Sequence, residues 1–224
     1  MHDKSQLPDL KLIQQSDGRP LVVGLGGSTR HLSRSLDSLR VALEGAERAG
    51  AAIMLLDIHQ LDLPMFDAEA PNYEIENVRT MLEVVRSANG LIVASPIYSE
   101  TVSGAVKNAL DYLSILELDE RPGLHGKAVG RISVTRGNPS PGASLIVEIV
   151  CRGLGAWILP DPVDLGGSSF GEGHRVFDIV ARDRLLALGR RVTEAAIARR
   201  AAEAGAAAGQ GERLGQVAGA GSPA

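Results

Sequence analysis

The chain of 224 residues is long enough for a single core, and the usual domain size does not require a second domain. Apolar residues make up 44% and charged residues 22%, as in soluble globular proteins, while aromatic residues at 3% are too scarce for a platform that binds single-stranded nucleic acid. The net charge of −4, mixed along the chain, gives no basic face, and no apolar run is long enough to cross a membrane, so we expect neither a nucleic-acid nor a membrane partner.

The first half of the chain alternates between predicted strands and helices. Residues 1–19 are polar and carry no pattern, so we expect an N-terminal extension. A buried strand is predicted at 21–25, where an apolar run leads into glycines, and another at 52–56. Between them, apolar residues recur every three or four positions from Ser35 and stop before Gly50, which indicates an amphipathic helix.

The same alternation continues to a last helix. The remaining predicted elements are helices at 75–85, 103–116 and 144–154 and strands at 91–94, 128–134 and 156–159. The last helix begins after Gly173, and we expect Val176, Ile179 and Val180 to face the core. Five strands that alternate with helices predict a doubly wound α/β fold, because parallel neighbours need helical crossovers.

Two segments fall outside this alternation. The stretch 161–173 is long and irregular, and we interpret it as a lid or an interface loop. At 204–224, glycines lie among alanines and polar residues, with too few apolar groups to offset the entropy of ordering, so we predict a disordered tail. A single domain at 20–203 remains.

The cysteine content and the N-terminus bear on the compartment. Cys151 is the only cysteine, so no intramolecular disulfide is possible and nothing indicates an oxidising environment. It lies in an apolar helical stretch, where we expect a buried small hydrophobe rather than a reactive thiol. The chain opens without an apolar run, and we therefore expect a cytoplasmic protein.

The loop after the first strand predicts a phosphate site. Ligands of doubly wound sheets bind at the carboxyl ends of the strands, beside the change in strand order. Gly26 and Gly27 allow the backbone to come close to a ligand, and Arg30 adds a planar, positively charged group. Hydroxyl groups follow where the helix begins with free N–H groups, on Ser28, Ser33 and Ser35.

A dinucleotide fingerprint is the alternative interpretation of this loop. Residues 24–29 read G-x-G-x-x followed by Thr29, where glycine or alanine is expected, and Asp57 at the end of the second strand is a candidate for binding a ribose. Pyrophosphate is usually held by backbone donors, whereas three hydroxyls and an arginine suit a terminal monophosphate. We therefore favour the monophosphate. A plain glycine turn with a serine N-cap explains only part of the cluster.

The loop after the third strand completes a family pattern. It reads Ser95-Pro96-Ile97-Tyr98-Ser99-Glu100-Thr101-Val102-Ser103-Gly104 and is followed by Lys107. Together the two loops resemble the NAD(P)H-dependent FMN reductase family, with G-S-x-R after strand one and P-x-Y…G-x-x-K after strand three. The resemblance covers about residues 21–165. It implies a flavodoxin-like three-layer sandwich, in which a five-stranded parallel sheet carries helices on both faces.

The resemblance also implies site residues for FMN. Its phosphate would be bound by Ser28, Arg30, Ser33 and Ser35, and the isoalloxazine edge would lie beside Pro96, Ile97, Tyr98 and Ser99. The loop after strand four, with Thr135, Arg136 and Gly137, would border the flavin pyrimidine. Arg136 departs from the small residues usual there, and both a solvent-facing role and a charge beside flavin N1 stay open. Lys107 is interpreted as a solvated or interface residue. No metal ligand and no catalytic side chain is predicted, because the flavin itself accepts the hydride.

The implied function is an oxidoreductase that uses NADPH or NADH to reduce FMN. Reduced FMN would then be supplied to a partner monooxygenase. The alternatives are an FMN-dependent quinone, azo or metal reductase, and, from another class, a non-enzymatic FMN electron-transfer protein. The family resemblance implies a homodimer or homotetramer. The helix at 103–116 agrees with it, because it has more apolar residues than one sheet-facing stripe requires.

Overall fold

The computed structural model describes residues 18–219 apart from 31, 71, 73 and 120–122, and its side chains are described to residue 206. The N-terminal extension predicted at 1–19 therefore lies almost entirely outside the described residues. Within them, no helix combines the length and the apolar character that a membrane crossing requires.

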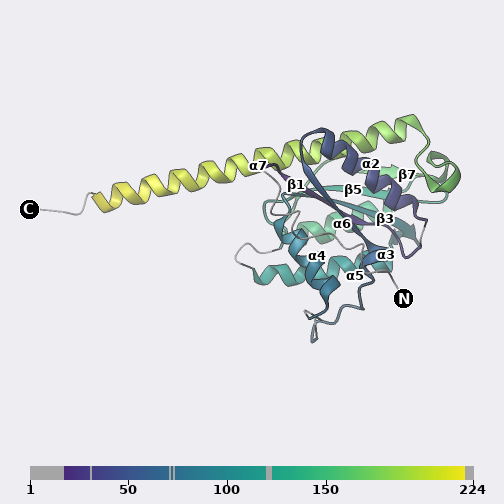
Figure 1. Ribbon diagram of the computed structural model, residues 1–224, viewed down its shortest axis with the longest axis horizontal. Helices are drawn as coiled ribbons and strands as arrows, with labels where there is room; N and C mark the ends of the chain where they lie inside the picture. Colours follow the sequence, from purple (N-terminus) through teal and green to yellow (C-terminus); the bar gives the residue numbers. More distant parts are fainter. Residues whose placement is uncertain (1–17, 31, 71, 73, 120–122, 220–224) are drawn as a thin grey trace, which may run out of the picture.

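A parallel sheet forms the centre of the molecule (Figure 1). Its order is β2-β1-β3-β5-β6, the flavodoxin-like order, so the direction of winding changes between β1 and β3. The bounds are β1 Leu21–Gly26, β2 Ala52–Asp57, β3 Gly90–Tyr98, β5 Ala128–Val134 and β6 Trp157–Ile158. The apolar runs fold as buried strands because helices cover both faces of the sheet. The predicted five-stranded parallel sheet is thus confirmed.

The helices divide into two layers, as Figure 1 shows. Helices α2 (Arg34–Arg48) and α7 (Ile179–Gly219) pack on one face, around Leu39, Leu43 and Leu185. The other face is covered by α4 (Glu76–Ser87), α5 (Gly104–Tyr112) and α6 (Gly142–Gly153), with Val85, Leu110 and Val147 in the core. Short helices complete the chain: α3 (Ile58–Leu61), η2 (Leu113–Leu118), η3 (Gly167–Ser169) and η4 (Glu172–His174).

The segment at 161–173 is tied into the fold rather than free to move as a lid. It contains the strand β7 (Val163–Leu165), which pairs in parallel with the end of β5, from Ile132 to Val134. A second short strand, β4 (Thr101–Val102), pairs antiparallel with the end of β3. Both additions extend the sheet at the carboxyl ends of the strands.

The start of α7 corrects one prediction about the core. Ile179 is 74% exposed and Val180 66% exposed, whereas Leu185 and Leu188 are buried. The carboxylate of Asp178 accepts hydrogen bonds from the backbone N–H groups of Val180 (3.3 Å) and Ala181 (3.1 Å). The helix therefore begins at Ile179, and this phase turns its first two residues away from the sheet.

Helix α7 runs into the tail that the sequence predicts to be disordered, and the disorder itself stays a prediction. Helix α7 continues through Gly219 and projects well beyond the body of the domain (Figure 1). Alanine has the highest helix propensity and is the commonest residue after position 200, whereas the glycines of the same segment oppose a helix. Whether this segment contributes to stability stays a prediction.

Candidate functional site

A cleft of about 1100 Å³ lies at the carboxyl ends of β1, β3 and β5. Every site residue predicted from the sequence lines it: Ser28, Arg30, Ser33, Ser35, Pro96, Ile97, Tyr98, Ser99, Thr135, Arg136 and Gly137. Three loops far apart in the chain therefore meet at one place. The cleft lies beside the change in strand order, where doubly wound folds bind their ligands.

The hydroxyl groups of the first loop are fixed at the start of α2. Ser33 is the N-cap: its Oγ accepts a hydrogen bond from Leu36 N (3.3 Å) and lies 2.9 Å from the Oγ of Ser35. The Oγ of Ser28 accepts from Arg30 N at 3.3 Å. The free N–H groups of the first turn and the positive end of the helix dipole are directed to the same place. This arrangement suits a phosphate.

Gly26 brings the first loop against the third strand. A methyl group on Gly26 would overlap the carbonyl oxygen of Ala94 in β3, so no larger residue fits there. The next residue, Gly27, donates its N–H to that same carbonyl at 3.2 Å. The first loop and the end of β3 are consequently held side by side.

The position of Asp57 argues against the dinucleotide interpretation, in which this residue would bind a ribose. Asp57 is 5% exposed, and its Oδ1 accepts a hydrogen bond from His59 N at 3.0 Å as the N-cap of α3. A buried carboxylate with a capping role is poorly placed to bind a ribose. The geometry favours the monophosphate.

The second loop is a tight two-residue hairpin between β3 and β4. Ile97 pairs with Val102 and Tyr98 with Thr101, and the turn residues Ser99 (φ 49°) and Glu100 (φ 62°) both have positive φ. That is the backbone of a type I′ turn, which is costly for residues other than glycine and asparagine. Residues 96–99 of the hairpin line the cleft, and Tyr98 is 48% exposed.

The third loop is held by β7 and the turn after it. Thr135 N donates to Leu165 O (2.9 Å), and Gly167 N donates to Gly137 O (2.8 Å). Thr135 Oγ1 donates to Asn138 O at 2.6 Å, which closes the loop on itself. Arg136 lines the cleft with an exposed side chain.

Several lining residues were not predicted from the sequence. They are Leu32, Arg34, Glu100, Val134, Asn138, Pro139, Ser140 and His174. His174 reaches the cleft from the segment after β7, which turns back through a bridge between Phe170 and Val176. Lys107 does not line the cleft and forms an ion pair with Asp111 (Nζ to Oδ1, 2.5 Å), in line with the solvated interpretation.

The charges of the cleft favour an anion. Its described lining has three arginines (30, 34 and 136) and one carboxylate, that of Glu100. Glu100 Oε2 lies 3.4 Å from the Oγ of Ser140, on the side of the second and third loops. Elsewhere, in the core beneath α6, burial raises the pKa of Cys151 to about 12, against a smaller lowering by Arg131. The lone cysteine is therefore buried and unreactive, as the sequence predicted.

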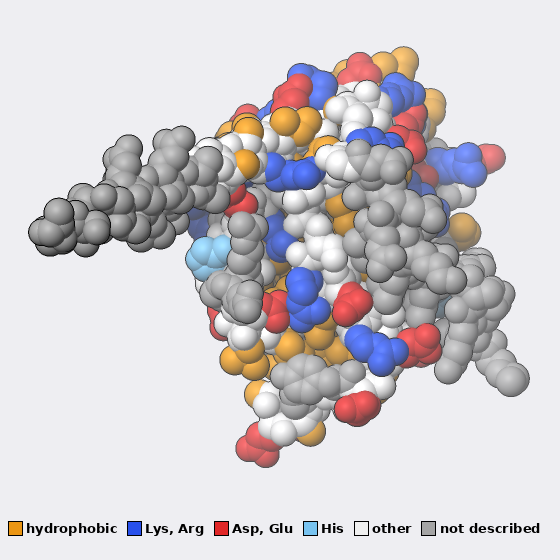
Figure 2. Space-filling view, turned by 60° about the vertical axis from the view of Figure 1, so that its left-hand side comes forward, with side chains coloured by type: hydrophobic (Ala, Val, Ile, Leu, Met, Phe, Trp, Pro, Cys, Tyr) orange, Lys and Arg blue, Asp and Glu red, His pale blue; other side chains and the backbone are white. Residues whose placement is uncertain are grey.

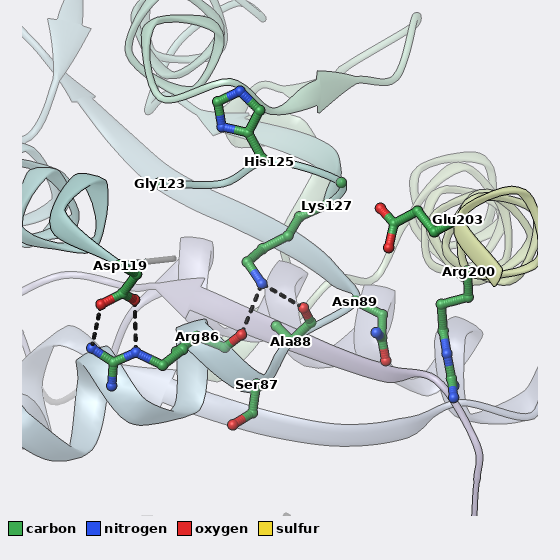
Figure 3. Close-up of a pocket in the computed structure, with 11 residues that line it drawn as sticks. Arg86, Ser87, Ala88, Asn89, Asp119, Gly123, His125, Lys127, Arg200 and Glu203 are labelled. Atoms are coloured by element: carbon green, nitrogen blue, oxygen red, sulfur yellow. Dashed lines mark hydrogen bonds and ion pairs between the residues drawn. The ribbon is translucent and has the colours of Figure 1, made fainter. Parts of the chain in front are cut away.

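A second pocket of about 510 Å³ lies at the opposite ends of the strands, beside the starts of β3 and β5 (Figure 3). There Lys127 Nζ donates to the carbonyl oxygens of Arg86 (2.9 Å) and Ala88 (2.7 Å) at the end of α4, and Arg86 Nε pairs with Asp119 Oδ2 at 2.7 Å. These groups satisfy one another. Their arrangement explains the packing of the helix end rather than the binding of a ligand.

The sequence pattern of a family described as NADPH-dependent FMN reductase matches residues 20–166. An NADPH azoreductase of Bacillus sp. (strain OY1-2) is 35% identical over 68 residues, which is 30% of this chain and 38% of that protein. An FMN reductase (NADPH) of Pseudomonas putida is 32% identical over 93 residues, or 42% of this chain and 46% of that protein. A quinone reductase of Escherichia coli is 37% identical over 70 residues, or 30% and 36%. The chain spans less than half the length of these curated relatives.

Solved structures share the fold at low sequence identity. An apo NADH:FMN oxidoreductase superposes on this chain with a TM-score of 0.63 at 20% identity. The aligned region covers 78% of this chain and 88% of the oxidoreductase chain. A flavodoxin from the domain Archaea superposes with a TM-score of 0.55 at 13% identity, and the aligned region covers 79% of this chain and 98% of the flavodoxin chain. The predicted flavodoxin-like fold is confirmed by these likenesses.

Proposed function

Because the chain belongs to the NADPH-dependent FMN reductase family, we propose that it binds FMN in the cleft and transfers a hydride to it from NADPH or NADH. One observation carries the proposal: the serine-rich start of α2 and the loops after β3 and β5 line one cleft. Bound FMN supplies the hydride acceptor, so the protein's own task is to bind and orient the reactants.

The residues present fit FMN. The hydroxyls of Ser28, Ser33 and Ser35, the first turn of α2 and Arg30 are all donors, which suits a phosphate. Beyond them, residues 96–99 and 135–137 border the rest of the cleft. A methyl group added to Gly137 would meet no atom within 4 Å, so this residue of the cleft wall is not packed against the rest of the protein.

Arg136 is the residue we assign to the electrostatics of the reaction. The sequence left two roles open for Arg136, one facing solvent and one facing the flavin. Because Arg136 lines the cleft, we favour the second. There the guanidinium would offset the negative charge that accompanies reduction at the flavin N1 and C2 carbonyl. No side chain is assigned to proton transfer.

The final electron acceptor defines a second candidate function. The azoreductase and quinone reductase among the relatives favour an FMN enzyme that passes electrons to an organic acceptor. Under our first proposal, reduced FMN is supplied to a partner monooxygenase. We also propose a cytoplasmic location.

A non-enzymatic electron carrier is the candidate from another class. Such carriers typically dock through a strongly acidic face. On the face in Figure 2, acidic and basic side chains are interspersed among the described residues. This observation gives the carrier no support.

We further propose a homo-oligomer, but through a different helix from the one expected. Ala105 and Ile115 of the 103–116 segment are partly buried against the core, so that segment has little apolar surface left over. On α6, Leu145 (52%) and Ile149 (66%) are exposed one helical turn apart. Helix α6 begins beside the cleft, since Ser140 lines it, so a second copy on this face would border the flavin site.

The test of the proposed function is anaerobic reduction of FMN by the purified 224-residue chain. We expect NADPH or NADH to bleach the flavin absorbance at a rate that rises with protein concentration. A carrier protein would bind FMN yet show no such acceleration, which would contradict the reductase. Adding a quinone, an azo dye or a purified flavin-dependent monooxygenase then separates the acceptors.

A further inference from the structure

Arg34 is a second arginine in the wall of the cleft, beside the phosphate loop. It is the first residue of α2, directly after the N-cap Ser33, and it lines the cleft. Its Cζ lies 5.3 Å from the centroid of the Phe170 ring. Phe170 is 9% exposed and belongs to the core cluster under α2 and α7. A ring fixed in the core therefore holds this guanidinium in place by a cation–π contact.

The charge of Arg34 is not neutralised by the groups that pack on it. Its Nε is buried and has no hydrogen-bond partner among the described residues. Its Nη1 lies against the turn at Gly167, 3.5 Å from where a methyl group on that glycine would be. Both neighbours, an aromatic ring and a glycine, are uncharged. The guanidinium is thus oriented by packing, while the acid one turn along α2, Asp37, accepts a hydrogen bond from Val176 N at 2.7 Å.

The surroundings of Arg34 select one kind of ligand. The hydroxyls of Ser33 and Ser35 and the free N–H groups of the first turn of α2 are the nearest polar groups along the chain. Glu100, the only carboxylate of the described lining, lies near Ser140 instead. A planar guanidinium that lines the same cleft as a set of donors matches the oxygens of a phosphate monoester.

We infer that Arg34, positioned by Phe170, is a second phosphate-binding arginine of this cleft. The G-S-x-R pattern assigns only Arg30, so this residue adds to the site that the motif predicts. The inference rests on the proposed function for its ligands: the phosphate monoester is either that of FMN or the 2′-phosphate of the nicotinamide donor. If it is the second, Arg34 makes the enzyme select NADPH over NADH.

The experiment compares Arg34→Ala with a matched control, Arg40→Ala, an exposed arginine on the same helix and outside the cleft. FMN and riboflavin are titrated by flavin fluorescence. Adenosine 2′,5′-bisphosphate and 5′-AMP are titrated by calorimetry on the apoprotein. Loss of one charge-assisted hydrogen bond in Arg34→Ala should raise the dissociation constant of the phosphate ligand by about tenfold or more, whereas Arg40→Ala should leave it unchanged.

The two sources of phosphate give different results. Weaker FMN binding with unchanged riboflavin binding assigns Arg34 to the flavin phosphate. Weaker binding of the 2′,5′-bisphosphate with unchanged 5′-AMP and FMN binding assigns it to the donor. Unchanged affinity for both phosphate ligands overturns the inference, and so does an equal loss of FMN and riboflavin, which indicates a structural role.

Two further variants separate charge from position. Arg34→Lys keeps the charge but loses the planar stack, and Phe170→Leu keeps Arg34 but removes the ring. Both variants should lower the affinity for the same ligand by less than Arg34→Ala does, and their melting temperatures should show that the protein is folded. A wild-type chain that binds no FMN contradicts the proposed function; the bisphosphate titration, read on the apoprotein, still decides the role of Arg34.

Discussion

Gly142, the first residue of α6, lies directly against the carbonyl oxygen of Glu100 in the turn between β3 and β4. A methyl group at Gly142 would overlap that oxygen. Both turn residues have positive φ, so the turn has little freedom to move aside without losing its hairpin. The start of α6 therefore restrains the turn after β3 and, through it, the end of β3 from Pro96 to Tyr98, which forms one wall of the cleft.

We predict that Gly142→Ala displaces this turn and weakens FMN binding. Overpacking of this kind typically costs about 1 to 3 kcal/mol, part of which should appear in the FMN dissociation constant. The matched control is Gly153→Ala at the other end of α6, where an added methyl group meets no atom within 4 Å. FMN titrations and thermal melts of both variants check this. Equal FMN affinity in the two would contradict the role of Gly142.

Cys151 should be inert in the folded protein. Burial raises its pKa to about 12, so the thiolate fraction stays very small until the pH approaches that value, and only the thiolate reacts with alkylating reagents. We expect no labelling by iodoacetamide at mildly alkaline pH, and rapid labelling once denaturant is added. Labelling of the native chain as fast as of the unfolded chain would refute the burial.

Removal of the residues after Ala204 should leave the melting temperature and FMN binding nearly unchanged. Few apolar side chains follow this position, so the helical segment has little to bury. Differential scanning calorimetry of the shortened chain and the full chain measures the effect. A melting temperature lower by many degrees would mean that the segment docks on the core or on another subunit.

The exposed face of α6 should hold two copies together. We expect Ile149→Asp to shift the chain towards the 23.5 kDa monomer, because a carboxylate would be buried at an apolar contact. The control is Ile197→Asp on α7, also exposed but on the other face of the sheet. Sedimentation at micromolar concentration compares them. A wild-type chain that is monomeric and reduces FMN at full rate would rule out the interface.

The sequence predicted the sheet and the cleft because both have local signals. Apolar runs mark the strands, and the phosphate and flavin loops follow strand ends whose convergence the fold class dictates. The prediction that Ile179 and Val180 face the core was wrong, because capping by Asp178, and not the apolar spacing, sets where the helix begins. β7 has only three residues, too few for a period. Arg34 belongs to the cleft through packing on Phe170, and His174 through the turn closed by the bridge between Phe170 and Val176 after β7, and neither leaves a pattern along the chain.

The measurement that tests the central claim most directly is the affinity of the chain for FMN and for riboflavin, with Arg30→Ala beside the wild type. We expect the wild type to bind FMN more tightly than riboflavin, because only FMN has the phosphate that the start of α2 receives. Arg30→Ala should weaken FMN binding by about 1.5 to 3 kcal/mol and leave riboflavin binding nearly unchanged, with the fold intact. A wild-type chain that does not distinguish the two flavins, or an Arg30→Ala variant with unchanged FMN affinity, would contradict the phosphate site on which the account is built.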